Sequence, residues 1–221
     1  MRNRSMVASV VGAIAVLTLA AAPVRAQLVN NGLPNGVGGN EMTQWIQAED
    51  FTLGGASILN SVRFWSLGAT GSYQGSINWQ IYSNSAGVPG SVLYFGLATP
   101  TTTAYPGAAC CGFPEGLQLD FALPAIALGA GTYWLGLHNG PLSTTTRLDF
   151  YWATTNGNAT GTGEEDIAPF GDVLASPWFN NANEHAFQLN ATNVVPEPAT
   201  MTLLATGLVG LVGAGRRRRK A

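Results

Sequence analysis

Apolar and polar residues alternate with a period of two along much of the central part of the chain. Successive side chains of a β-strand point to opposite faces, so this pattern predicts strands with one buried face. The alternation is clearest in four stretches, 77–82, 117–123, 148–152 and 187–189. Gly-, Pro- and Asn-rich stretches separate these from four further predicted strands, 44–51, 58–65, 91–98 and 132–138.

The central part shows no convincing apolar stripe with the 3.6-residue period of a helix. Short strands joined by turn-rich links favour an antiparallel β-sandwich of jelly-roll type. By the same alternation, Trp79, Trp134 and Trp152 fall on buried positions. The sequence therefore predicts a mostly β body over 27–193, flanked by an N-terminal signal helix and a C-terminal transmembrane helix.

Residues 1–26 have the three parts of a secretion signal. Two arginines are followed by an uncharged apolar run over 6–22, and small residues precede a predicted cleavage between Ala26 and Gln27. Basic residues stay in the cytoplasm while such a run inserts, so the body is expected outside the inner membrane. The alternative is an uncleaved membrane anchor.

Residues 194–221 combine a Pro-rich start, an apolar run and a basic end. The run over 199–215 carries no charge, and as a helix it would be about 25 Å long, slightly short of the ~30 Å hydrocarbon core. The prolines keep the preceding stretch extended, at the outer face of the membrane, where a peptidase could grip it. The basic residues that follow the run are expected to stay cytoplasmic; they are Arg216, Arg217, Arg218, Arg219 and Lys220.

This C-terminal segment resembles the PEP-CTERM sorting signal, in which Pro-Glu-Pro precedes an apolar helix and a basic cluster. The resemblance implies that Pro196, Glu197 and Pro198 are recognised by an exosortase-type membrane peptidase, which cuts at or near them. It also implies a bacterium that makes exopolysaccharide, transient anchoring in the inner membrane, and a final place at the cell surface or outside the cell. The alternative is a permanent C-terminal anchor.

The body also resembles, more loosely, the β-sandwiches that often precede this tail. That resemblance brings no catalytic residue with it. The segments that carry it are Ala48–Leu53, Ile58–Trp65, Trp79–Tyr82, Ala86–Gly90 and Gly131–Leu135.

The body is strongly acidic. Between 27 and 195 it has eleven carboxylates against Arg63 and Arg147, and no lysine, so its formal net charge is −9. Such a surface repels phosphates, which excludes nucleic acid as a partner. Divalent cations and neutral polymers remain compatible with it.

Cys110 and Cys111 are adjacent in the sequence. Neighbouring Cα atoms are ~3.8 Å apart, below the ~4.4–6.8 Å of an ordinary disulfide, so a bond between them would be strained. A redox-labile vicinal disulfide and an intermolecular bridge are the functional interpretations. A loop bridge and two free thiols are the structural alternatives. Nothing nearby supplies further ligands at zinc-like spacing.

Four acidic residues are candidate calcium ligands. Glu164, Glu165 and Asp166 fall in a Gly- and Asn-rich stretch that is predicted to be a loop, and Asp172 follows six residues later. Calcium takes six to eight oxygens from carboxylates and loop carbonyls, although the spacing here is not that of an EF-hand. The alternative is a plain acidic loop, and no other cofactor is expected.

Two tryptophans are candidates for a sugar-binding platform. Trp45 and Trp178 are flanked by polar or loop residues, and a tryptophan offers a flat apolar face beside a polar edge. Such faces suit sugar rings, so the sequence allows a carbohydrate-binding module, with or without calcium.

The body offers few groups for catalysis. His138 and His185 are its histidines, and Ser143 lies near the first of them without a Gly-x-Ser-x-Gly elbow. Asp120 and Asp149 would pair across a sheet if the body were a glycosidase, or else stay solvated. The sequence therefore favours a non-enzymatic exported surface or matrix protein associated with exopolysaccharide. A carbohydrate-binding module and a secreted carboxylate-based hydrolase are the alternatives.

Overall fold

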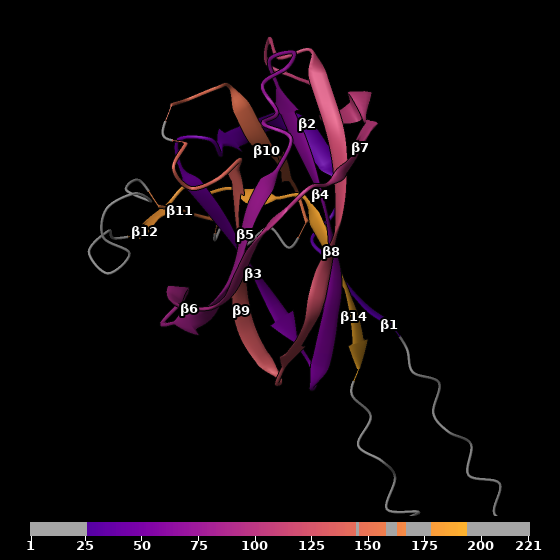
Figure 1. Ribbon diagram of the computed structural model, residues 1–221, viewed down its shortest axis with the longest axis vertical. Coiled ribbons are helices and arrows are strands. Elements are labelled where there is room, and N and C mark those ends of the chain that lie inside the picture. The colour runs from indigo at the N-terminus through magenta and orange to yellow at the C-terminus, as the bar shows by residue number, and fades with distance from the viewer. Residues whose placement is uncertain (1–25, 145, 158–162, 167–177, 194–221) are drawn as a thin grey trace, which may run out of the picture.

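The computed structural model of the 221-residue chain describes residues 26–144, 146–157, 163–166 and 178–193. They form two antiparallel β-sheets that face each other across a shared apolar core (Figure 1). The predicted mostly β fold is confirmed, and the helical content of the described residues is one 3-10 turn, η1 (Pro106–Ala108). Among those residues no helix is long and apolar enough to cross a membrane. The helices predicted for the two ends of the chain fall outside the described ranges.

The larger sheet has eight strands. They are β1 (Ala26–Asn30), β2 (Pro34–Glu41), β4 (Ser57–Gly68), β7 (Thr101–Ala104), β8 (Glu115–Leu128), β10 (Phe150–Thr155), β13 (Glu184–His185) and β14 (Phe187–Asn193). Strand β4 is the organising strand, because β8 pairs along one of its edges and β14 and β10 follow each other along the opposite edge. Strand β10 pairs in addition with β2 and β13.

The smaller sheet has six strands. In spatial order they are β12 (Trp178–Asn180), β11 (Glu164–Asp166), β3 (Ile46–Leu53), β9 (Gly131–Asn139), β5 (Ile77–Ser85) and β6 (Val88–Ala98). All eight predicted stretches overlap strands of the two sheets. The sequence pattern missed β1, β2, β7 and the three short strands β11, β12 and β13.

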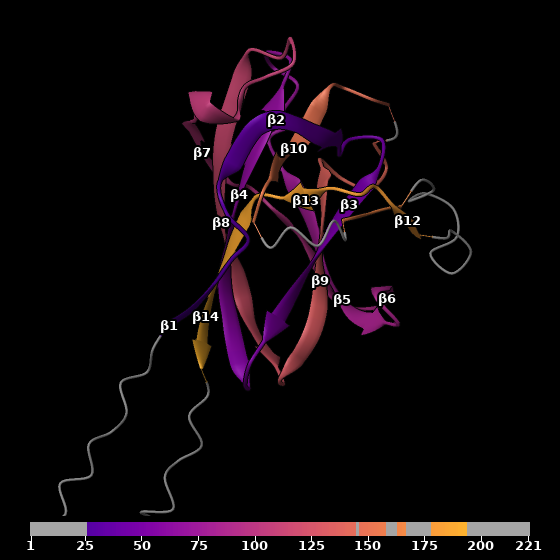
Figure 2. The same cartoon turned by 180° about the vertical axis from the view of Figure 1, so that it is seen from behind.

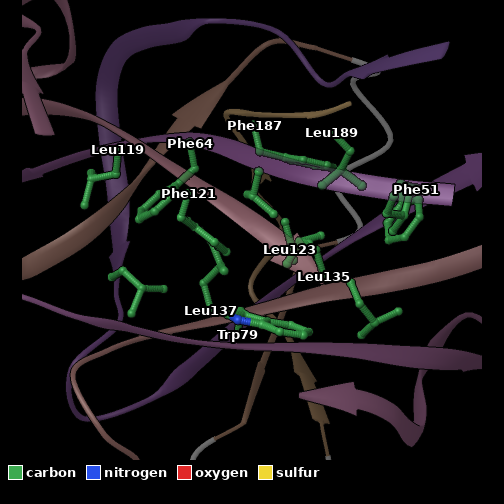
Figure 3. Packing of buried hydrophobic residues seen from close by; sticks show 14 of the residues in the cluster. Phe51, Phe64, Trp79, Leu119, Phe121, Leu123, Leu135, Leu137, Phe187 and Leu189 are labelled. Atoms are coloured by element: carbon green, nitrogen blue, oxygen red, sulfur yellow. The ribbon is translucent and has the colours of Figure 1, made fainter. Parts of the chain in front are cut away.

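The inner faces of the two sheets bury large apolar side chains against each other (Figure 3). Burying one such side chain stabilises the fold by roughly 1.5–3 kcal/mol. The predicted burial of Trp79, Trp134 and Trp152 is confirmed, since none is more than 4% exposed. Trp134 packs with Ala48 and Tyr82 in a separate cluster, because its neighbours along β9 are the ones that face the core. The core residues labelled in Figure 3 are Phe51, Phe64, Trp79, Leu119, Phe121, Leu123, Leu135, Leu137, Phe187 and Leu189.

The first and last strands of the body lie side by side, β1 against β14 (Figures 1 and 2). Ala26 lies opposite Thr192, and Asn30 lies opposite Gln188. Strand β14 also pairs with β4 along its other edge, so it is hydrogen-bonded on both sides. The described chain therefore begins and ends at the same end of the molecule, which we call the terminal pole.

Candidate functional site

The predicted secretion signal, 1–26, and the predicted sorting signal, 194–221, adjoin the two strands of the terminal pole in the sequence. The predicted cleavage between Ala26 and Gln27 falls at the start of β1, where Gln27 pairs with Ala191. Strand β14 ends at Asn193, directly before the predicted sorting segment. Residues 1–25 and 194–221 lie outside the described residues, and with them Pro196, Glu197, Pro198 and the basic end. The described strands run from Ala26 to Asn193, so β1 begins one residue before the predicted start of the body.

Asp120 and Asp149 do not form the glycosidase-like pair that the sequence left open as an alternative to two solvated carboxylates. Arg63 Nε lies 2.6 Å from Asp120 Oδ1, and Arg147 Nε lies 3.0 Å from Asp149 Oδ1. The Asp149 carbonyl accepts a hydrogen bond from the backbone N–H of Ala69. Ala69 lies six residues along the chain from Arg63, so the two aspartates are roughly 20 Å apart at the spacing of a strand. Glycosidase carboxylates are ~5–9.5 Å apart. The hydrogen bond from the Tyr151 hydroxyl and the pairing with Arg147 lower the pKa of Asp149, which keeps it an ion-paired surface carboxylate.

The predicted acidic loop is a strand over its first three residues. Glu164–Asp166 form β11, which pairs with β3 on one side and β12 on the other. The loop premise is therefore wrong for these residues, because backbone pairing fixes them in the sheet. Glu164 is only 3% exposed, and its burial raises the pKa of its carboxyl. The described ranges contain no group of three or more His, Cys, Asp or Glu side chains that would hold a metal ion. Asp172 falls outside them, and calcium binding stays a prediction.

The two predicted platform tryptophans are half-buried. Trp178 packs edge-on against Tyr82, with ring centroids 5.3 Å apart, at the border of the Trp134 cluster. Part of the surface of the Trp178 ring is therefore covered by Tyr82 and is not open to a sugar. A sugar platform at Trp45 or Trp178 stays a prediction.

Cys110 and Cys111 are both free thiols, so no disulfide joins them. Cys111 has a left-handed backbone with φ of 61°, and its thiol donates to the carbonyl of Val37 at 2.9 Å. Burial, with the neighbouring Cys111 thiol, raises the pKa of Cys110 to about 11. At neutral pH Cys110 is therefore a thiol with little nucleophilic character.

Both histidines are fully buried. His138 Nδ1 lies 3.1 Å from the carbonyl oxygen of Gly140, and burial lowers its pKa. His185 is held by Glu49, an arrangement that the sequence did not predict. Its Nδ1 lies 2.7 Å from Glu49 Oε2, and its backbone N–H donates to the same oxygen at 2.8 Å. Its ring also packs on Trp152 with 4.8 Å between ring centroids.

Burial decides the protonation of this pair. Desolvation, reinforced by the nearby Glu184 carboxylate, raises the pKa of Glu49 to about 10, and desolvation lowers the pKa of His185 to about 3. The contacts suit a neutral pair in which the Glu49 hydroxyl donates to Nδ1. The Nε2–H of His185 then donates to Asn40 Oδ1 at 3.2 Å. At neutral pH the proton between the two side chains therefore stays on Glu49, and His185 is neutral.

A groove of about 480 Å³ lies beside this pair, where β10 ends between β2 and β13. We call it the polar groove. Thr155 lies in the middle, paired with Pro34 of β2 and with Glu184 of β13. Glu184 is 5% exposed, and its Oε2 accepts a bond from Asn31 Nδ2 at 3.3 Å. The groove is lined by Asn35, Val37, Thr154, Thr155, Asn156, Ala182, Asn183 and Glu184.

One sequence signal pointed toward this region. The alternation within the predicted strand 44–51 places Gln47 and Glu49 on the same face as the core residue Phe51. Polar residues at core-facing positions indicate a buried hydrogen-bond network. The partners of Glu49 could not be read from that signal, because His185 lies 136 residues further along the chain.

Comparison with known proteins assigns the C-terminal segment. The PEP-CTERM protein-sorting motif matches residues 194–219, so the predicted sorting signal is confirmed. No curated protein matches the chain. One solved structure is similar, that of the cysteine protease and lectin-like domains of Cwp84, a surface layer associated protein of Clostridium difficile. It shares 12% identity at a TM-score of 0.37, over 69% of this chain and 33% of that chain.

Proposed function

We propose that this chain is the precursor of an exported surface protein that an exosortase-type peptidase sorts through its PEP-CTERM motif. The released body then acts without catalysis in an exopolysaccharide layer. The match of the sorting motif to residues 194–219 is the observation that carries this proposal. The motif implies export, a membrane-anchored intermediate and transfer to the surface.

The ends of the body support the proposal. The motif begins directly after β14, and that strand is paired on both edges within the sheet. A cut within 196–198 would therefore leave every strand of the body in place. A cut after Ala26 would remove only the first residue of β1. Both processing steps are compatible with a folded body.

The terminal pole also suggests how the intermediate is oriented. Attachment through the residues that follow Asn193 turns the terminal pole toward the membrane. Strand β14 ends at that pole, and its seven residues extend the body about 20 Å from it at ~3.3 Å per residue. The opposite end of the body is then presented to the outside.

The candidate catalytic groups favour a non-catalytic body. Asp120 and Asp149 each pair with an arginine, and the rings of His138 and His185 are enclosed in the fold. A general base must reach a substrate proton within hydrogen-bond distance. These groups are occupied or enclosed, so a binding or structural role fits them better than hydrolysis.

Intact mass spectrometry of each cell fraction from the native host tests the proposal. The surface fraction is expected to contain a species that starts at Gln27 and ends within 196–198. Glu197→Ala should move the protein to the inner membrane as a form that retains the basic end. Glu115→Ala is the matched control, because Glu115 also follows a proline but lies within the body. Wild-type protein that keeps Arg216–Lys220 in the inner membrane would mean that the tail is a permanent anchor.

A further inference from the structure

We infer that the polar groove is a binding site for a neutral oligosaccharide. Its biological setting, an exopolysaccharide layer, rests on the proposed function. The binding chemistry does not, and it follows from which polar atoms the groove offers and which charges it lacks.

The two walls of the groove hold amide groups in fixed orientations. Asn35 Nδ2 donates to Asn156 Oδ1 at 3.0 Å, which leaves the Asn156 amide nitrogen as a donor with no partner in the part of the chain that the structure describes. Across the groove, Asn183 uses its amide nitrogen for Asn40 Oδ1 at 3.1 Å and the Asn181 carbonyl at 2.9 Å. Its Oδ1 thereby remains an acceptor. A donor and an acceptor are thus oriented before any ligand arrives, which reduces the entropy lost on binding.

Intramolecular bonds also hold the two strands of one wall together. The Thr154 hydroxyl lies 2.9 Å from both Asn35 Oδ1 and the Gly38 carbonyl, and the Thr155 hydroxyl donates to the Leu33 carbonyl at 2.8 Å. These bonds tie the end of β10 to β2 on one side of the groove. The site is therefore largely preformed, as ligand sites usually are.

Glu184 adds a third kind of polar group at the edge of the buried network. Its Oε2 accepts the bond from Asn31 Nδ2 at 3.3 Å, which holds the carboxylate at the wall of the groove. Sugar hydroxyls donate and accept at once, and they would complement an amide donor, an amide acceptor and a carboxylate together. Val37, which is 71% exposed, and Ala182 add apolar surface for the C–H groups of a sugar ring.

Charge selects among saccharides. Among the described residues that line the groove none is basic, and the two arginines of the body, Arg63 and Arg147, are each paired with their own aspartate. A uronate, sulfate or phosphate substituent would meet Glu184 without a counter-charge, in a body of net charge −9. Bringing like charges together without a partner is unfavourable. The groove therefore suits uncharged sugars and disfavours acidic ones.

The groove is also far from the terminal pole. Glu184 lies nine residues before Asn193, the last residue of β14, and that separation spans roughly 30 Å in extended chain. A tether at the terminal pole would leave the groove facing outward. The site would then be open both in the anchored intermediate and after release.

Isothermal titration of the full chain in a zwitterionic detergent without sugar groups tests the inference. The probes are neutral gluco-, manno- and galacto-oligosaccharides, with oligogalacturonate as the acidic comparison. At least one neutral probe is expected to bind, and oligogalacturonate at least tenfold more weakly or not at all. The inference would be overturned if none of the neutral probes gave a heat of binding, or if oligogalacturonate bound more tightly than they do.

Two variants locate the binding at the groove. Losing a hydrogen bond to a neutral partner weakens binding several-fold and losing one to a charged partner by tenfold or more, so Asn156→Ala and Glu184→Gln should each show such a loss. Asn156 is exposed, and its variant decides the matter even if Glu184→Gln does not fold. Asn60→Ala is the matched control on an exposed position of β4 and should bind as wild type does. Unchanged binding in both groove variants would show that the sugar binds elsewhere.

The outcomes separate this inference from the proposed function. Correct processing in the host together with no glycan binding refutes the groove alone. Glycan binding by a protein that keeps its basic end in the inner membrane refutes the sorting proposal alone.

Discussion

The two ends of the sandwich are built from the same strands but filled with different chemistry. Toward the terminal pole, β3 contributes Phe51 and Leu53 to the apolar core. Farther from it, the same face of β3 contributes Gln47 and Glu49, both fully buried. The two ends of the space between the sheets therefore differ in polarity, although the backbone pairing of β3 with β9 is continuous.

The difference indicates what each end does. An apolar interior is stabilised wherever surface leaves water, whereas a buried polar network needs every partner in place and often adds little net stability. The polar end holds Glu49 and His185 next to Glu184, at the margin of the polar groove. We interpret the apolar end as the part that stabilises the fold, and the polar end as the part that fixes the groove.

The largest effect is expected from a cavity at the apolar end. Leu59 is fully buried and pairs with Ile126 and Ala191 near the terminal pole. Leu59→Ala should lower the free energy of unfolding by about 2–5 kcal/mol, through lost burial and the cavity left behind. Urea denaturation would measure it, with Leu97→Ala, at a position 58% exposed, as the control. Equal losses in the two variants would contradict the assignment of this end as the stabilising one.

The pH dependence of stability tests the polar end. The raised pKa of Glu49, about 10, means that its contribution is fully present below about pH 4.5 and is lost as the pH rises toward 10. The lowered pKa of His185, about 3, has the opposite sign, since its contribution is present above about pH 6.5 and is lost as the pH falls toward 3. The two slopes cancel where they overlap, between about pH 4.5 and pH 6.5. Above pH 6.5 only the Glu49 slope remains.

Stability should therefore fall between pH 7 and pH 9, by up to about 1.4 kcal/mol per pH unit for one proton. Glu49→Gln cannot titrate and should flatten that slope, whereas Glu115→Gln, at a partly exposed position of β8, should keep it. Urea denaturation at several pH values measures both. A slope that persists in Glu49→Gln would show that another group carries the proton.

The smallest effect is expected from an exposed ion pair. Arg63 and Asp120 bond at 2.6 Å, but their side chains are 42% and 34% exposed. Asp120→Asn should change the free energy of unfolding by less than about 1 kcal/mol, because water and salt screen such pairs. The same denaturation experiment at low and high salt would measure it. A loss as large as that of Leu59→Ala would place this pair among the main stabilising contacts.

The sequence predicted the long strands because their alternation is local. Leu119, Phe121 and Leu123 face the core with polar or small residues between them, as the two-residue period of β8 requires. It missed β2, whose residues include three glycines and carry no such pattern. It also missed β11, where Glu164–Asp166 were assigned to a loop by composition, because pairing with β3 depends on chain that lies more than a hundred residues away.

The sequence by itself identified the sorting motif of this protein, because such a motif consists of consecutive residues. Pro196–Pro198, the apolar run and the basic end carry that information in consecutive residues, and the motif match at 194–219 agrees. Only the tertiary structure brought Asn35, Asn156 and Glu184 to one groove, and Glu49 to His185. Those contacts depend on strand pairing between segments far apart in the sequence, and such pairing produces no local periodic pattern from which it could be predicted.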